Sequence, residues 1–336
     1  MPAPTRIAVT IDTEEEWDWA SGYPTGATRV TNISRLPAFQ DILDRHGVKT
    51  TYFTNHAVLS NRETCDTILK LAERPNVEIG LHIHPWNTPP LQPVEKVSPR
   101  ESFLHNLPRA LAERKLDESF AAFEKAGLKP NCYRGGRYST SKPIQDYLRD
   151  RGIVADCSVL PFNTWTDDSA PDYRYCDLVP VRLPPRHVAD DAMWELPLTF
   201  GFIGRPFGFW KSIFQFIDSP ILKSLPLGGI VGRVFGARKC WLNFENPLGE
   251  NMTDLLPVIR RLELPFACFT LHSSSLLPGG SPYCKTQVDV DRLLKTVDDT
   301  LAIVAKRTDF VASTITETVH HLEALQHAGH RHQPIG

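Results

Sequence analysis

Two short motifs combine residue types that can bind a metal ion and activate water. Asp12 and Glu14 follow the apolar run of RIAVTID, and because they are two positions apart, both side chains point to one side of an extended chain. His82 and His84 stand in the same relation in GLHIHPW. One carboxylate with two imidazoles forms a three-ligand site that leaves positions for water, and the second carboxylate could handle a proton. The alternatives are a solvated acidic loop and structural histidines.

Two further motifs could supply the remaining groups of a hydrolase. In YRGGRYS, Arg134 could orient a catalytic carboxylate and hold it ionised, while the glycines permit close backbone approach. The same motif is also typical of a turn with surface charges. In FTLHSS, His272 titrates in a range that suits a general acid. A serine nucleophile at Ser273 or Ser274 is less favoured, because the sequence around them is not G-x-S-x-G.

These residues follow strands of a repeating βα pattern. Strands are predicted over residues 6–12, 48–54, 77–83, 131–134, 152–159, 266–272 and 309–313. Helices are predicted from residue 34 and over residues 61–74, 108–126, 141–151, 253–262, 288–306 and 314–327. About seven such units without a dinucleotide fingerprint favour an α/β barrel, whose functional residues lie at the carboxyl ends of the strands. We expect a single domain over residues 1–336.

The pattern is interrupted between residues 160 and 250, where proline and aromatic residues are frequent. MWELPLTF and CWLNFEN are the clearest strand candidates there, and we interpret the segment as an insertion or lid. Its aromatic residues fit two interpretations, a lid packed on the barrel or a surface that faces a lipid carrier or a membrane. They are Phe202, Phe207, Phe209, Trp210, Phe214 and Phe216, accompanied by Arg205 and Lys211.

The composition argues against several other classes of protein. Of the 336 residues 41% are hydrophobic and 23% charged, enough for a sizeable core, and the net charge of -2 without a basic face argues against nucleic-acid binding. The seven cysteines form no C-x-x-C pair, which predicts reduced thiols and a cytoplasmic location. We expect neither a membrane span, which needs about 18 apolar residues, nor a signal peptide.

Taken together, the motifs resemble those of the NodB-homology polysaccharide deacetylases, carbohydrate esterase family four, and within them the WalW-like lipopolysaccharide-biosynthesis branch. The resemblance rests on VTIDTEE, EIGLHIHPW, YRGGRYS, ADCSV and FTLHSSSLLPGGSPY, in family order. It implies a distorted (β/α)7 barrel and a divalent metal, usually zinc, that supports hydrolysis of an N-acetyl sugar. By motif, Asp12 would be the general base, tethered by Arg134, and His272 the general acid. Glu14 and His82 would be metal ligands.

The second histidine ligand is expected to be His84. The family usually spaces these histidines four residues apart, a position that Trp86 occupies in this chain. His84 is the nearby substitute at a different spacing. The first motif also departs from the family, since Thr13 separates its two carboxylates and leaves open an exchange of the base and ligand roles.

The substrate is predicted to be an amino sugar, free or linked to a lipid or nucleotide. We expect Trp86, Arg137, Tyr138 and Glu195 to contact it, and Trp17, Trp19 and Trp165 to stack on sugar rings or pack in the core. The predicted reaction is removal of an acyl group, most often acetyl, during assembly of a cell-envelope polysaccharide or lipopolysaccharide. The alternatives are a non-catalytic carbohydrate-binding relative and a membrane-surface partner of an assembly enzyme.

Overall fold

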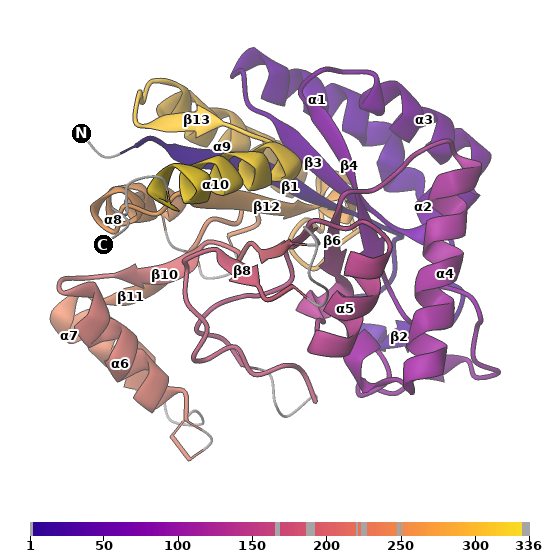
Figure 1. Cartoon of the computed structure of the whole chain (residues 1–336), viewed down its shortest axis with the longest axis horizontal. Coiled ribbons are helices and arrows are strands. Elements are labelled where there is room, and N and C mark those ends of the chain that lie inside the picture. The colour runs from indigo at the N-terminus through magenta and orange to yellow at the C-terminus, as the bar shows by residue number, and fades with distance from the viewer. Residues whose placement is uncertain are drawn as a thin grey trace.

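A curved β-sheet occupies the centre of the molecule, with helices around it (Figure 1). The computed structural model describes residues 3–330 except 165–168, 186–191, 220, 223–226, 247–248 and 250. The strand order is β12-β1-β3-β4-β6-β7-β9-β8, and β13 pairs with β1. The pairs are parallel except β8 with β9, so the main chain returns through helices between successive strands.

The elements follow the predicted alternation closely. The main-sheet strands are β1 (Thr5–Thr13), β3 (Thr50–Thr54), β4 (Val77–Ile83), β6 (Cys132–Gly135), β7 (Ala155–Asp156), β8 (Val181–Leu183), β9 (Met193–Glu195), β12 (Phe266–His272) and β13 (Phe310–Ala312). Two small sheets pair β2 (Tyr23–Pro24) with β5 (Lys96–Val97), and β10 (Phe200–Ile203) with β11 (Arg238–Trp241). The helices are α1 (Leu36–Arg45), α2 (His56–Ser60), α3 (Arg62–Ala72), α4 (Arg109–Lys125), α5 (Lys142–Asp150), α6 (Phe207–Ile217), α7 (Leu227–Phe235), α8 (Leu256–Arg261), α9 (Gln287–Ala305) and α10 (Ile315–His330).

Backbone hydrogen bonds join the two ends of this sheet. Leu198 N donates to Val159 O beside β7 at 2.9 Å, and Leu242 N donates to Thr199 O at 3.0 Å. On the far side, Thr270 N of β12 donates to Leu242 O at 2.9 Å. The segments after β9 and β11 therefore connect β7 to β12 and complete a distorted ring. The predicted α/β barrel is confirmed.

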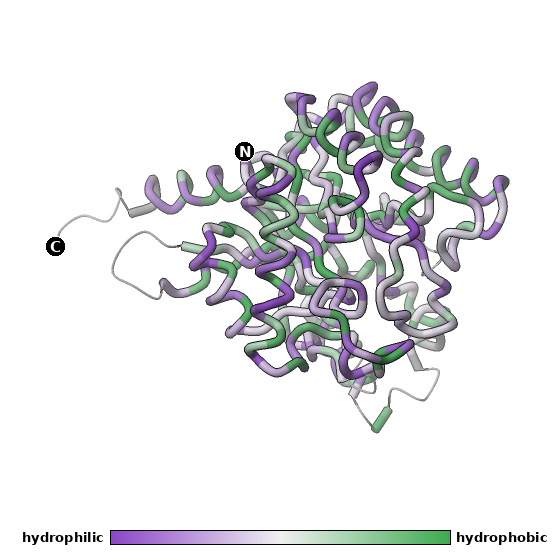
Figure 2. Tube along the Cα trace, turned by 90° about the vertical axis from the view of Figure 1, so that its right-hand side faces the viewer, coloured by the Kyte–Doolittle hydropathy of each residue, from purple (hydrophilic) through white to green (hydrophobic). Residues whose placement is uncertain are grey.

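The barrel interior is apolar at one end and polar at the other. A buried cluster from β1, β3, β6, β7, β9 and β12 packs against Ile315, Val319 and Leu322 of α10. The first turn of α10 lies beside the amino end of β4, where Ile315 N donates to Glu78 Oε2 at 2.9 Å. The helix thus covers the amino end of the barrel, and its last turns project from the body (Figure 2). The opposite end is left for the polar residues.

Residues 200–241 form a separate element, which we call the arm. It consists of the antiparallel strands β10 and β11 with α6 and α7 between them, and the two helices lie side by side away from the main sheet (Figure 1). MWELPLTF is not one strand, because β9 ends at Glu195 and β10 begins at Phe200. β8 and β9, although within residues 160–250, belong to the main sheet.

The aromatic residues of the arm divide between two faces. Phe202, Trp210 and Phe214 are buried in the main hydrophobic cluster, whereas Phe209 and Phe216 are 55% and 67% exposed. One face of the arm is therefore packed in the core and the other is exposed to solvent. Among the described residues, no helix combines the length and apolarity needed to cross a bilayer.

Candidate active site

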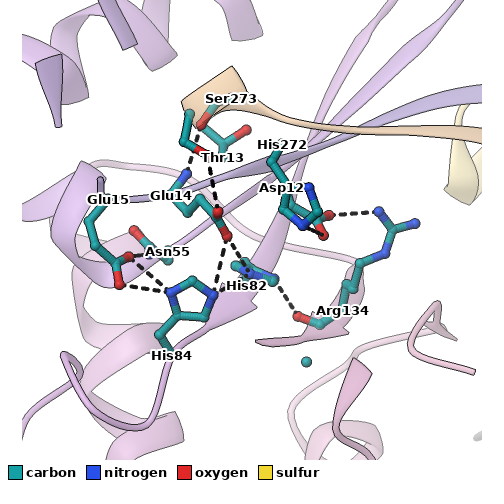
Figure 3. A network of polar contacts seen from close by, with 12 residues as sticks. Asp12, Thr13, Glu14, Glu15, Asn55, His82, His84, Arg134, His272 and Ser273 are labelled. Atoms are coloured by element: carbon teal, nitrogen blue, oxygen red, sulfur yellow. Dashed lines mark hydrogen bonds and ion pairs between the residues drawn. The ribbon is translucent and has the colours of Figure 1, made fainter. Parts of the chain in front are cut away.

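The carboxyl ends of β1, β4, β6 and β12 bring the predicted polar residues together (Figure 3). The strand register places Asp12 level with His272, and His82 level with Arg134. Glu14 lies one residue beyond the end of β1 and His84 one residue beyond β4. Strand alternation and placement at the carboxyl ends of the strands, the two features on which the sequence prediction depended, thus produce one cluster.

Glu14, His82 and His84 form a compact group of potential metal ligands. Glu14 Oε2 lies 3.2 Å from His84 Nε2 and 3.5 Å from His82 Nε2, and the two Nε2 atoms are 3.1 Å apart. One potential ligand atom from each residue lies within 4.8 Å of those from the other two, and all three residues are buried. Two imidazoles and a carboxylate are a donor set typical of catalytic zinc.

The hydrogen bonds around the two imidazoles fit a metal at this point. Nδ1 of His82 donates to the carbonyl oxygen of Arg134 at 2.8 Å, and Nδ1 of His84 faces the carboxylate of Glu15 at 2.9 and 3.0 Å. With Nδ1 protonated in both rings, each Nε2 has a free lone pair directed toward Glu14. The residues present therefore fit a divalent metal.

Glu15 contacts the potential ligand His84, and the sequence prediction missed it. It is fully buried, and its carboxylate accepts from Trp86 Nε1 at 3.1 Å and from Asn55 Nδ2 at 2.5 Å, in addition to facing His84. Burial acts to lower the pKa of His84, but the charge of Glu15 and the hydrogen bond with Glu14 raise it to about 10. A cationic partner, a proton or a metal ion, is therefore favoured at Nε2. The signal in the sequence was three successive glutamates after a strand.

Asp12 is held as a carboxylate by Arg134. Arg134 Nη1 donates to Asp12 Oδ1 at 2.7 Å, while its other nitrogens donate to Thr10 Oγ1 at 3.0 Å and the carbonyl of Cys157 at 3.1 Å. Burial acts to raise the pKa of Asp12, but the charges of Arg134, His82 and His272 outweigh it and lower the pKa. Asp12 is thus an ionised carboxylate, available to accept a proton.

His272 carries the opposite charge. Its Nε2 is 3.8 Å from Asp12 Oδ2, and its Nδ1 lies 2.8 Å from Glu245 Oε2. Burial acts to lower the pKa of His272, but the charges of Glu245, Glu14 and Asp12 raise it to about 10. These charges therefore favour the protonated form of the ring. Glu245, which also accepts from Ser275, was not predicted, since it follows the arm and lies 27 residues from His272 in sequence.

These groups face a cavity of about 300 Å³ with largely aromatic walls. Trp17 and Trp19 stack with ring centroids 5.3 Å apart; Trp17 stands edge-on to His84, and Trp19 to His272. The aromatic residues around the cavity are Trp17, Trp19, Tyr23, Trp86, Phe103, Tyr138, Trp241 and Tyr283. Apolar rings thus surround the charged groups, an arrangement suited to the apolar faces of a sugar.

The predicted substrate contacts of YRGGRYS and Trp86 do line the cavity. Arg137 and Tyr138 have positive φ angles of 53° and 59°. Arg137 donates to Ser102 Oγ at 2.6 Å and lies over the ring of Phe103. Trp86 is 1% exposed and stacks on His84 with ring centroids 4.1 Å apart, so it also supports that ring.

The predicted placement of Glu195 in the cleft is wrong. Residues alternate sides along β9, and since Trp194 belongs to the interior cluster, Glu195 points outward. Its carboxylate lies near Gln145 of α5, outside the cavity lining. Burial and the charge of Asp156 raise the pKa of Glu195 to about 7. Trp165, also predicted near the sugar, lies outside the described residues.

One solved structure shows which fold this chain has. It comes from Mycobacterium smegmatis, is described as a candidate polysaccharide deacetylase, and matches over 97% of this chain and 92% of its own with a TM-score of 0.57 at 15% sequence identity. The chain has the polysaccharide-deacetylase fold. At this identity the likeness concerns the fold, and the chemistry has to be argued from the site.

Two further solved structures resemble this deacetylase fold at TM-scores below 0.5, and nothing is concluded from them. A 4-alpha-glucanotransferase from Thermococcus litoralis matches over 95% of this chain and 40% of its own, at a TM-score of 0.48 and 9% identity. A candidate polysaccharide deacetylase involved in O-antigen biosynthesis from Bordetella bronchiseptica matches over 96% and 91%, at 0.40 and 13%. No protein-family model matches the sequence, and no curated protein matches it.

Proposed function

We propose that this protein is a metal-dependent hydrolase that removes an N-acetyl group from an amino sugar. The observation that carries the proposal is the arrangement of the polar residues in the cavity. An ionised carboxylate, Asp12, and a protonated imidazole, His272, lie 3.8 Å apart beside the ligand group of Glu14, His82 and His84. Amide hydrolysis needs a base, an acid and an electrophile in one place, and this cavity has groups for each.

Asp12 acts as the base. It accepts the proton that a water molecule loses as its oxygen bonds to the acyl carbon. Arg134 keeps Asp12 ionised and oriented through the 2.7 Å hydrogen bond. Glu14, by contrast, contacts two imidazoles, which supports assigning Glu14 as the metal ligand. The base and ligand roles therefore follow the motif order.

His272 acts as the acid. It donates a proton to the sugar nitrogen as the bond between nitrogen and the acyl carbon breaks, releasing an amine and a carboxylate. Glu245 holds the imidazole through Nδ1 and favours its protonated form, which leaves Nε2 to face the cavity. Bound by Glu14, His82 and His84, a divalent metal, in our proposal zinc, supplies a Lewis acid for the acyl carbonyl.

The aromatic walls support a carbohydrate substrate. A pyranose offers apolar C–H faces that stack on indole rings, and Trp17 and Trp19 stand beside His84 and His272, where the acetamido group must lie. From the motif resemblance we assign the sugar to a cell-envelope polysaccharide or lipopolysaccharide, and the protein to the cytoplasm.

Release of acetate from N-acetylglucosamine oligosaccharides by the purified, zinc-loaded protein tests this function. Asp12→Asn keeps the shape of the side chain but not its basicity, so we expect hydrolysis to fall by about 10²–10⁴-fold. The zinc content should stay at the wild-type level, because Asp12 is not in the ligand group. A zinc-loaded wild-type protein that binds the sugars without releasing acetate would be a carbohydrate-binding relative, contrary to the proposal.

A further inference from the structure

The arm exposes large apolar side chains that the barrel does not cover. Phe209 and Phe216 of α6 are 55% and 67% exposed, and Phe235 at the end of α7 is 65% exposed. Phe209 and Phe216 are seven positions apart, so they lie on one side of the helix, about 120° from its buried side chains Trp210 and Phe214. α6 therefore has an apolar face toward the barrel and a second one toward solvent.

Aromatic contacts join the exposed side chains at the start of α6 to those at the end of α7. The ring of Trp210 is 5.0 Å from that of Phe209 and 5.7 Å from that of Phe235, so the start of α6 and the end of α7 are joined by aromatic contacts. Val234 next to Phe235 is also 65% exposed, and Ile221, after the other end of α6, is 86% exposed. An apolar surface of this kind commonly marks an interaction site.

The charge of the arm indicates which kind of partner it binds. Between residues 205 and 239 there is a single acidic residue, Asp218. The six basic residues of this segment are Arg205, Lys211, Lys223, Arg233, Arg238 and Lys239. Lys211, Lys239 and Arg238 pair with Asp177, Asp218 and Asp254, and Arg205, the fourth basic residue whose side chain the structure describes, is exposed. The whole chain, by contrast, has a net charge of -2.

We propose that the arm docks on a membrane surface that contains anionic phospholipids. Exposed phenylalanines insert between lipid headgroups and basic residues attract the lipid phosphates, the combination found in helices that lie in a membrane interface. A second copy of this chain would present the same positive excess and repel it, which favours the membrane as partner. Because β11 ends at Trp241, which lines the cavity together with Asn243, docking would hold the cavity close to the bilayer.

Sedimentation of the full chain with vesicles tests the proposal. We expect the protein to sediment with vesicles of equimolar phosphatidylglycerol and phosphatidylcholine, to do so less in high salt, and to stay in solution with phosphatidylcholine alone. In Phe209→Ser/Phe216→Ser, partitioning to the anionic vesicles should fall by about tenfold or more. Arg205→Glu should weaken it several-fold, without removing any apolar surface.

Ile303→Ser on α9 is the matched control, since Ile303 is a 46% exposed apolar residue outside the arm and should be replaceable without effect. The proposal is wrong if the wild-type protein stays in solution with both kinds of vesicle, or if the double variant sediments as well as the wild type. It is equally wrong if light scattering shows a dimer that the double variant converts to a monomer. None of these measurements depends on hydrolysis, so the result is independent of the proposed reaction.

Discussion

At the mouth of the barrel Arg134 is fully buried and donates hydrogen bonds to three neighbours, whereas on the arm Phe216 is 67% exposed to solvent. In the first region, charged side chains such as Asp12, Glu14 and Arg134 have been removed from water and have specific partners. In the second, apolar side chains have been left in water. Both arrangements cost free energy in the isolated chain, and such costs are typical of functional surfaces. Substitutions in the first region should therefore change hydrolysis or stability strongly, whereas substitutions of the exposed side chains of the arm should change neither by much.

The largest effect should come from the ligand group. Glu14→Gln keeps the volume of the side chain but removes the charge between His82 and His84, so we expect the bound zinc to be lost and hydrolysis to fall by at least about 10³-fold. Metal analysis after dialysis, with circular dichroism to confirm folding, measures this. Glu195→Gln, at a half-buried carboxylate outside the cavity lining, is the matched control and should keep its zinc. Full zinc content in Glu14→Gln would remove Glu14 from the ligands.

Arg134→Leu should have the largest effect on stability. It leaves Asp12 as a buried carboxylate without its partner, which should cost about 3–5 kcal/mol in the free energy of unfolding. Combining it with Asp12→Asn removes that charge, so the double variant should recover part of the loss. Urea denaturation of the two single variants and the double variant gives the coupling free energy. Additive losses would show that the ion pair does not contribute as a pair.

Glu245→Gln should change the pH dependence of the reaction. The charges of Glu245, Glu14 and Asp12 together raise the pKa of His272 to about 10, so removing the charge of Glu245 lowers that pKa. An acid must be protonated to act, and the basic limb of the kcat/KM profile should therefore move to lower pH. The acidic limb, which reflects protonation of Asp12, should move little. An unshifted basic limb would mean that another group is the acid.

The smallest effect on the folded state should come from the arm. In Phe209→Ser/Phe216→Ser the replaced side chains are more than half exposed, so the free energy of unfolding should change by no more than about 0.5 kcal/mol per site. Hydrolysis of a soluble substrate should also be unchanged. Phe202→Ser and Phe214→Ser, on the buried face of the same arm, should each cost several times more. Equal losses on both faces would mean that the exposed side chains pack against the protein.

The sequence allowed prediction of those residues that strand geometry determines. Asp12, His82 and His272 are in strands, where alternation fixes the side and the barrel fixes the end. His84 was inferred from the same alternation, one residue beyond its strand. The prediction for Glu195 was wrong because MWELPLTF does not indicate which of its alternating sides faces inward. That depends on the register of β9 with β7, which is a long-range property.

Glu15 and Glu245 could not have been predicted in this way. Glu15 lies two residues beyond β1, but its role depends on contacts with Asn55 and His84, from two other loops. Glu245 reaches His272 only because the arm leaves the barrel and returns beside β12. Side chains that support a reactive group from a neighbouring loop produce no periodic pattern, and three-dimensional structure is needed to find them.

The packing of α10 against the amino end of the barrel has a consequence for the order of events in catalysis. Ile315, Val319 and Leu322 fill that end. In the described part of the chain, molecules can therefore enter and leave the barrel at the carboxyl end of the strands. In the proposed reaction, substrate and both products would then share one opening, and acetate would form beside Glu14, His82 and His84. We expect the amino sugar to leave first and acetate last, so that added acetate competes with the incoming substrate.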